Sequence, residues 1–119
     1  MQLTEKERQS LRDIVDNAER IAEYTRGMDR DAFVLSALAR DATERCLARI
    51  SEAATRIRKQ DGELVAATDF DWVPVHDLGN ILRHVYDRVN SDVIWTIVAE
   101  QLPDLERRAR GWLGQQVEK

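Results

Sequence analysis

The stretch VHDLGNILRHVYDRV, residues 75–89, decides the fold class. Its apolar side chains return after three and then four residues, at Val75, Leu78, Leu82, Val85 and Val89. An α-helix advances about 100° per residue, so this spacing gathers them into one stripe, whereas a half-buried strand requires strict alternation. The stretch is therefore predicted to be an amphipathic helix that begins at Pro74, because proline is tolerated in a first helical turn.

Helical spacing also extends over the first half of the chain. A first helix is expected to begin at Thr4, whose hydroxyl is placed to cap it, and to end near Gly27. A second opens around Asp29 to Asp31 and reaches Gln60, which makes it either one long helix or two helices with a bend. Its predicted core positions are Phe33, Leu38, Ala42, Leu47, Ile50, Ala54 and Ile57.

The pattern is interrupted at residues 61–74, which we expect to form a loop with Phe70 and Trp72 folded onto the core. A fourth helix is predicted to start at Asn90 or Ser91. Pro103 is expected to interrupt the chain before a final helix that runs from Asp104 towards Gly114. The sequence thus predicts an all-α fold, an antiparallel bundle of four to five helices, as a single domain over residues 1–119.

Composition limits the partners of the protein. With 119 residues, 43% of them hydrophobic and 34% charged, the chain is typical of a soluble globular protein. The lone Cys46 and the absence of a signal-like start favour the cytoplasm, and no stretch is apolar enough to predict a membrane span. The net charge of −4 is atypical of proteins that bind nucleic acid over a broad basic face. Nucleic-acid chemistry would therefore need a local basic pocket.

The face opposite the apolar stripe of residues 75–89 gathers polar side chains: His76, Asn80, Arg83, His84 and Asp87, with Tyr86 at the border. One interpretation is a solvated polar face, which is common on bundle helices. The other is a general acid–base site, because histidine transfers protons near neutral pH and arginine clamps phosphate with two parallel hydrogen bonds. These groups can cleave RNA without a metal by deprotonating a 2′-hydroxyl and stabilising the charged phosphorane.

Other kinds of site are poorly supported. The two histidines, His76 and His84, are eight residues apart, about 12 Å along a helix, which is too far to share one metal ion. No cysteine pair, zinc-protease motif or glycine-rich phosphate loop is present, so we expect no metal and no cofactor. Cys46 is interpreted as a packing residue, and no serine is marked as the nucleophile of a triad.

Four segments, in order along the chain, resemble the HepT-like proteins of the HEPN superfamily. Residues 24–33 (YTRGMDRDAF) resemble the family's "YTxG…F" junction, and residues 44–54 (ERCLARISEAA) its "ExxLxxIGEAA" helix. Residues 79–87 (GNILRHVYD) followed by Val93-Ile94-Trp95 resemble its signature region. Residues 102–105 (LPDL) match its "LPxL" start of the last helix. The similarity covers about residues 10 to 113.

The resemblance implies an all-α homodimer in which the His-x-Tyr segments of two protomers face each other. It implies a metal-independent ribonuclease toxin of a type VII-like toxin–antitoxin pair, with an MntA-like nucleotidyltransferase as antitoxin. Carried over to this sequence, His84 is the acid–base residue and Tyr86 receives AMP from the antitoxin. Because AMP adds bulk and negative charge where an RNA phosphate must lie, its transfer to Tyr86 would inhibit cleavage.

The sequence departs from the family pattern at Gly79, where the family has an arginine five residues before the histidine. Arg83, one turn further on, is the candidate to supply the phosphate-binding cation, within its own protomer or across the dimer. The alternative is a catalytically weak or inactive HEPN dimer that binds a nucleotidyltransferase or a nucleotide. Asn80 either orders the pocket through His84 or is a surface residue. Asp87 either fixes the imidazole tautomer or pairs with a neighbouring arginine.

Other candidate residues receive structural interpretations. His76 is expected to be an ordinary surface residue near the start of its helix. Trp95 and Trp112 are expected to be core or dimer-contact residues rather than platforms for base stacking. A last group of arginines either helps to hold RNA or complements the dipole of the final helix, and it consists of Arg107, Arg108 and Arg110.

Overall fold

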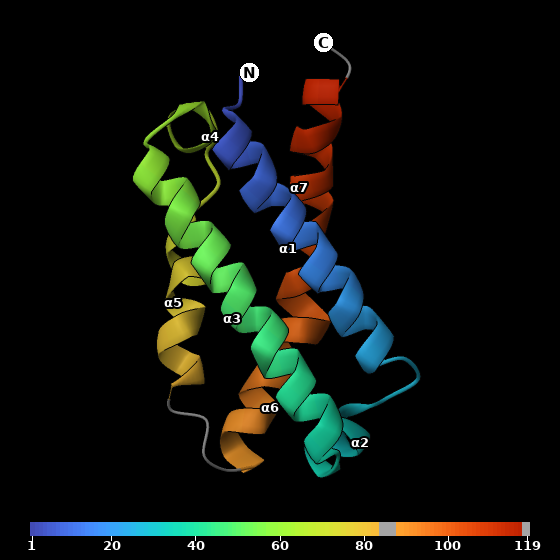
Figure 1. Cartoon of the computed structure of the whole chain (residues 1–119). Helices are drawn as coiled ribbons and strands as arrows, with labels where there is room; N and C mark the ends of the chain where they lie inside the picture. The colour runs from blue at the N-terminus through green and yellow to red at the C-terminus, as the bar shows by residue number, and fades with distance from the viewer. Residues whose placement is uncertain (84–87, 118–119) are drawn as a thin grey trace.

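The structure is a computed structural model that describes residues 1–83 and 88–117. Every regular element in these residues is helical, which confirms the predicted all-α class. The elements are α1 (Glu5–Tyr24), α2 (Arg30–Leu35), α3 (Ala37–Gln60), α4 (Glu63–Ala66), α5 (Val73–Leu82), α6 (Arg88–Thr96), the π-helix η1 (Ile97–Gln101) and α7 (Leu102–Val117). Helix α1 packs against α3 and α7, and α5 packs along α3 (Figure 1).

Helix α1 begins as predicted, at an N-cap formed by Thr4. The backbone N–H of Glu7 donates to the Thr4 hydroxyl at 3.0 Å, and the N–H of Thr4 donates to the Glu7 carboxylate at 2.9 Å. This capping box satisfies two backbone donors that a helix start leaves without partners. The turn after α1 contains Gly27, whose φ of +73° is readily adopted only by glycine.

The long second helix is in fact two helices that meet at Ser36. The extended backbone of Ser36 ends α2, and the Ser36 hydroxyl accepts from the N–H of Ala39 at 3.1 Å and so caps α3. Of the two predicted alternatives, one long helix or two helices with a bend, the second is therefore confirmed. The core prediction for Leu38 was wrong, since this side chain is 83% exposed. The break at Ser36 interrupts the helical phase on which that prediction depended.

The core lies mainly between α1 and α3. In α1, Leu11, Ile14 and Ile21 are completely buried, and in α3 the predicted core residues Leu47, Ile50, Ala54 and Ile57 are as well. Phe70 and Trp72 fold onto this core as expected, with ring centroids 4.7 Å apart. Within the segment predicted as loop, residues 63–66 form the short helix α4, which differs from the prediction.

The last third of the chain departs most from the prediction. Helix α5 ends at Leu82, so it is shorter than the predicted helix, and Arg88 already belongs to α6 rather than preceding it. Pro103 does not interrupt the chain, because α6, η1 and α7 follow one another and α7 starts at Leu102 instead of Asp104. Pro103 lacks an N–H donor, and it stands just after a π-helical turn, where the N–H of Leu102 bonds to the carbonyl of Ile97.

Among the residues that the structure describes, no helix combines the length and the apolar character needed to cross a membrane.

Candidate active site

Helix α5 lies close to α3 at Gly79. The hydroxyl of Ser51 on α3 donates to the carbonyl of His76 at 2.7 Å and accepts from the N–H of Gly79 at 3.0 Å. A Cβ on residue 79 would lie only 3.1 Å from this hydroxyl oxygen. Glycine therefore allows the two backbones to lie close together, and Ser51 holds them there with two hydrogen bonds.

The side chain of Arg83 folds back along α5 over Gly79. Its Nη2 donates to the Asn80 carbonyl oxygen at 3.1 Å, and its Nη1 lies 3.8 Å from the position that a Cβ on residue 79 would take. The guanidinium thus occupies the face on which a side chain at position 79 would begin. Asn80 is an exposed surface residue whose side chain accepts from Arg83, and its predicted contact with His84 lies outside the described residues.

His76 is half-buried rather than an ordinary surface residue. Its Nδ1 lies 2.6 Å from the hydroxyl of Thr55 on α3, and this hydroxyl also donates to the carbonyl of Ser51 at 3.0 Å. A threonine has one hydroxyl proton. When the Thr55 hydroxyl donates this proton to the Ser51 carbonyl, the hydrogen bond to His76 must use a proton on Nδ1. In a neutral His76 ring, Nε2 is then an acceptor.

These residues line a polar hollow of about 550 Å³ between α3 and α5. Helix α3 contributes Ser51, Glu52 and Thr55, and α5 contributes His76, Asp77, Asn80 and Arg83. The structure therefore brings together three residues that the helical wheel placed on one face: His76, Asn80 and Arg83. The predictions for His84, Tyr86 and Asp87 lie outside the described residues.

The residues of α3 were missed by the sequence reasoning. The available signal was that Ser51 and Thr55 are four residues apart, which places both hydroxyls on one helix face. Which partner that face contacts is a tertiary property. Among residues 1–83 and 88–117, no group of three or more His, Cys, Asp or Glu side chains is arranged to hold a metal ion.

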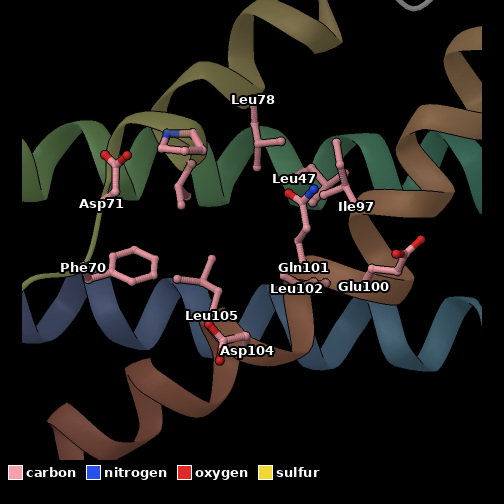
Figure 2. Close-up of a pocket in the computed structure, with 12 residues that line it drawn as sticks. Leu47, Phe70, Asp71, Leu78, Ile97, Glu100, Gln101, Leu102, Asp104 and Leu105 are labelled. Carbon is pink, nitrogen blue, oxygen red and sulfur yellow. The ribbon is translucent and has the colours of Figure 1, made fainter.

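A second hollow, of about 320 Å³, opens between α5, η1 and α7 (Figure 2). Leu47, Leu78 and Leu105 are among its apolar lining residues, and Asp71, Glu100 and Asp104 supply carboxylates. None of the described residues that line it is an arginine, lysine or histidine, so it offers no cation to a phosphate. The polar hollow, which contains both an arginine and a histidine, is therefore the candidate site for phosphodiester chemistry.

Other candidates have structural roles. Cys46 is buried, and burial raises the pKa of its thiol, which agrees with a packing residue. The ring of Trp95 packs against that of Phe33 at a tilt of 40°, with centroids 5.4 Å apart, and the ring centroids of Trp112 and Trp72 are 5.8 Å apart. The arginines of α7 form ion pairs, because Arg107 and Arg108 bind Asp104 and Arg110 binds Glu106 and Glu19. Their charges are thus compensated within the fold.

Comparisons with known proteins show the family of this chain. Residues 14–110 match the family model described as "Ribonuclease HepT-like". The chain belongs to the HepT-like ribonuclease family. A relative in Methanocaldococcus jannaschii, named "Putative RNase MJ1380", is 30% identical over 97 residues, which are 82% of this chain and 87% of that protein. No solved structure matches the chain.

Proposed function

We propose that this protein is a metal-independent endoribonuclease toxin and acts as a homodimer. Membership of a ribonuclease family supports the reaction class. The observation that carries the proposal is the position of Arg83, whose guanidinium lies over Gly79. It supplies a cation on the helix face where other members of the family have theirs.

In the proposed reaction, His84 removes the proton of a ribose 2′-hydroxyl, and the 2′-oxygen attacks the adjacent phosphorus. The bond from phosphorus to the 5′-oxygen breaks, and an imidazolium, from the same site or from the facing protomer, returns a proton to this oxygen. The products are a 2′,3′-cyclic phosphate and a 5′-hydroxyl. Arg83 stabilises the negative phosphorane, and Asn80 orients Arg83 through the 3.1 Å hydrogen bond. Asp87 is assigned the support of the imidazole.

The regulation we propose follows from Tyr86, two residues after His84. An MntA-like nucleotidyltransferase antitoxin transfers AMP to its hydroxyl. The added phosphate and nucleoside then exclude the RNA phosphate from the neighbourhood of Arg83 by bulk and by charge repulsion.

A cleavage assay tests the enzyme. The assay compares wild-type protein with Arg83→Ala, Arg83→Lys and His84→Ala. Each protein is incubated, in the presence of a chelator, with an RNA strand and separately with the matched DNA strand. Wild type should cut only RNA, because DNA lacks the 2′-hydroxyl. Arg83→Ala and His84→Ala should lose about a hundredfold or more in rate, in the range of a single transition-state or acid–base contact. Arg83→Lys should retain part of the activity, since lysine keeps the charge but not the paired donors. Equal background rates for all four proteins refute the ribonuclease proposal.

The regulation is tested by co-expression with the product of a neighbouring nucleotidyltransferase gene. Mass spectrometry should find the mass of AMP on the peptide that contains Tyr86, and a Tyr86→Phe variant should lack it. Wild type expressed alone should arrest growth, and His84→Ala should not.

The second candidate is a non-catalytic dimer that binds a nucleotidyltransferase. It is favoured by the absence of an arginine at position 79. Under this function, wild type forms a complex with the nucleotidyltransferase but neither cuts RNA nor arrests growth.

A further inference from the structure

The polar hollow does not end at His76. A second depression of about 260 Å³ adjoins it, lined by Thr55, Arg58, Lys59 and His76. Thr55 and His76 line both hollows, so their hydrogen-bonded pair forms the junction. Because the two hollows share this pair, we refer to them together, from Arg83 to Arg58 and Lys59, as the α3–α5 groove.

Positive charge is placed at the two ends of this groove. Arg83 lies at one end, and at the other the exposed Arg58 and Lys59 occupy the last turn of α3. In the described part of the chain neither Arg58 nor Lys59 forms an ion pair, in contrast to Arg56 on the same helix, which binds Asp13 at 2.8 Å. Both remain available to an anionic ligand.

The middle of the groove has the opposite chemistry. Glu52 and Asp77 line it, and ionised carboxylates only accept hydrogen bonds and repel phosphate. They can accept from ribose hydroxyls and from the amino groups of bases. At the junction the Nδ1 of His76 is engaged by Thr55, which leaves Nε2 to face a ligand. Phosphates are therefore favoured at the ends, and sugars and base edges between them.

The length of the groove fits several nucleotides. The guanidinium of Arg83 lies over Gly79, three residues from His76, which is about 4.5 Å along the axis of α5, and Arg58 is three residues beyond Thr55 on α3, about 4.5 Å further. The total of about 9 Å corresponds to about three nucleotides at the stacked rise of about 3.4 Å. Base edges reach Glu52 and Asp77 only when they are unpaired, which favours single-stranded RNA over a duplex.

We propose that the α3–α5 groove binds the single-stranded RNA that flanks the cleaved bond, with one phosphate at Arg83 and a distal phosphate at Arg58 and Lys59. The proposal rests on the ribonuclease function and extends it, since beyond Arg83 it assigns a binding path to residues that take no part in the cleavage step. It explains how a protein with a net charge of −4 can bind RNA through a few placed cations.

The test compares a dinucleotide with a six-nucleotide single strand. Arg58→Gln/Lys59→Gln removes two charges from the distal end. Lys6→Gln/Arg20→Gln is the matched control, because it removes two exposed charges from α1 and changes the net charge equally. Thermal melting of both variants checks folding. Cleavage efficiency is measured for both substrates, and binding of a 2′-O-methylated hexamer is measured at several salt concentrations.

The groove variant should lose about tenfold or more in cleavage efficiency and affinity for the hexamer and less than about twofold for the dinucleotide. The salt slope of hexamer binding should be lower by about 0.7, which corresponds to the loss of the one distal phosphate contact. The control should change neither substrate by more than about twofold. Equal losses in both variants, or equal losses on both substrates, overturn the groove. If wild type binds the hexamer without cutting it, the ribonuclease function is refuted. The hexamer affinities of the groove variant and the control then determine whether the groove binds RNA. If wild type neither cuts nor binds RNA, both proposals fail.

Discussion

Substitution of Gly79 by alanine isolates the contact that sets the spacing of α3 and α5. In an open helix interior this change raises the free energy of unfolding by about 0.5–1 kcal/mol, because glycine has the larger conformational entropy when unfolded. Here the new Cβ would lie 3.1 Å from the Ser51 hydroxyl, which is held by two hydrogen bonds. Overpacking of this kind costs about 1–3 kcal/mol. We therefore expect a net loss of about 1 kcal/mol.

The same substitution should have the opposite sign when Ser51 is alanine. The nearest remaining atoms are then Arg83 Nη1 at 3.8 Å and the Cβ of residue 51 at 3.9 Å from the new Cβ, and both are ordinary van der Waals contacts. Ser51→Ala by itself should cost about 1–2 kcal/mol through its two lost hydrogen bonds. In the Ser51→Ala variant, Gly79→Ala should stabilise by about 0.5–1 kcal/mol. Compared with the loss of about 1 kcal/mol in wild type, this gives a coupling energy between the two residues of about 1.5–2 kcal/mol.

Urea denaturation of wild type, the two single variants and the double variant measures all four free energies of unfolding. The m-values should agree, which would show that the unfolded states are comparable. RNA cleavage by Gly79→Ala should change little, since the new Cβ would be 3.8 Å from Arg83 Nη1, again an ordinary contact. A coupling energy within about 0.5 kcal/mol of zero refutes the close approach of Gly79 to Ser51.

Three further predictions concern residues outside the groove. Gly62→Ala would place a Cβ 2.8 Å from the buried carboxylate of Glu7, and it should lower the free energy of unfolding by about 1–3 kcal/mol, measured by thermal or urea denaturation. Gly111→Ala is its control: the new Cβ would have no atom within 4 Å, so this variant should be stabilised by up to about 1 kcal/mol. Thr4→Ala removes the capping box and should cost about 1 kcal/mol in the same assay, whereas an unchanged midpoint contradicts the cap. Because burial raises the pKa of Cys46, alkylation of the folded protein by iodoacetamide should need a higher pH than alkylation in urea, and equal pH profiles would contradict it.

Local patterns predicted the features that depend on neighbours in sequence. The cap at Thr4 and the buried stripes of α1 and α3 follow from side chains within one or two turns of each other, so they could be predicted without a fold. Predictions failed where context overrode the local rule. Leu38 is exposed because Ser36 breaks the helix, and Pro103 is tolerated because a π-helical turn precedes it.

The same division applies to the candidate site. Helical period placed His76, Asn80 and Arg83 on one face of residues 75–89, and all three line the polar hollow. No periodicity indicated that Ser51 would contact Gly79, or that Thr55 would bind His76, since these partners are 28 and 21 residues apart.

The sequence by itself therefore determined the all-α class, the family and the polar face that contains Arg83. Only the tertiary structure decided what that face contacts: Ser51 and Thr55 on α3, the close approach at Gly79, and the groove that continues to Arg58 and Lys59. The physical reason is the range of the interactions. Helical period and caps act over a few residues, whereas contacts between helices depend on how the whole chain packs its core.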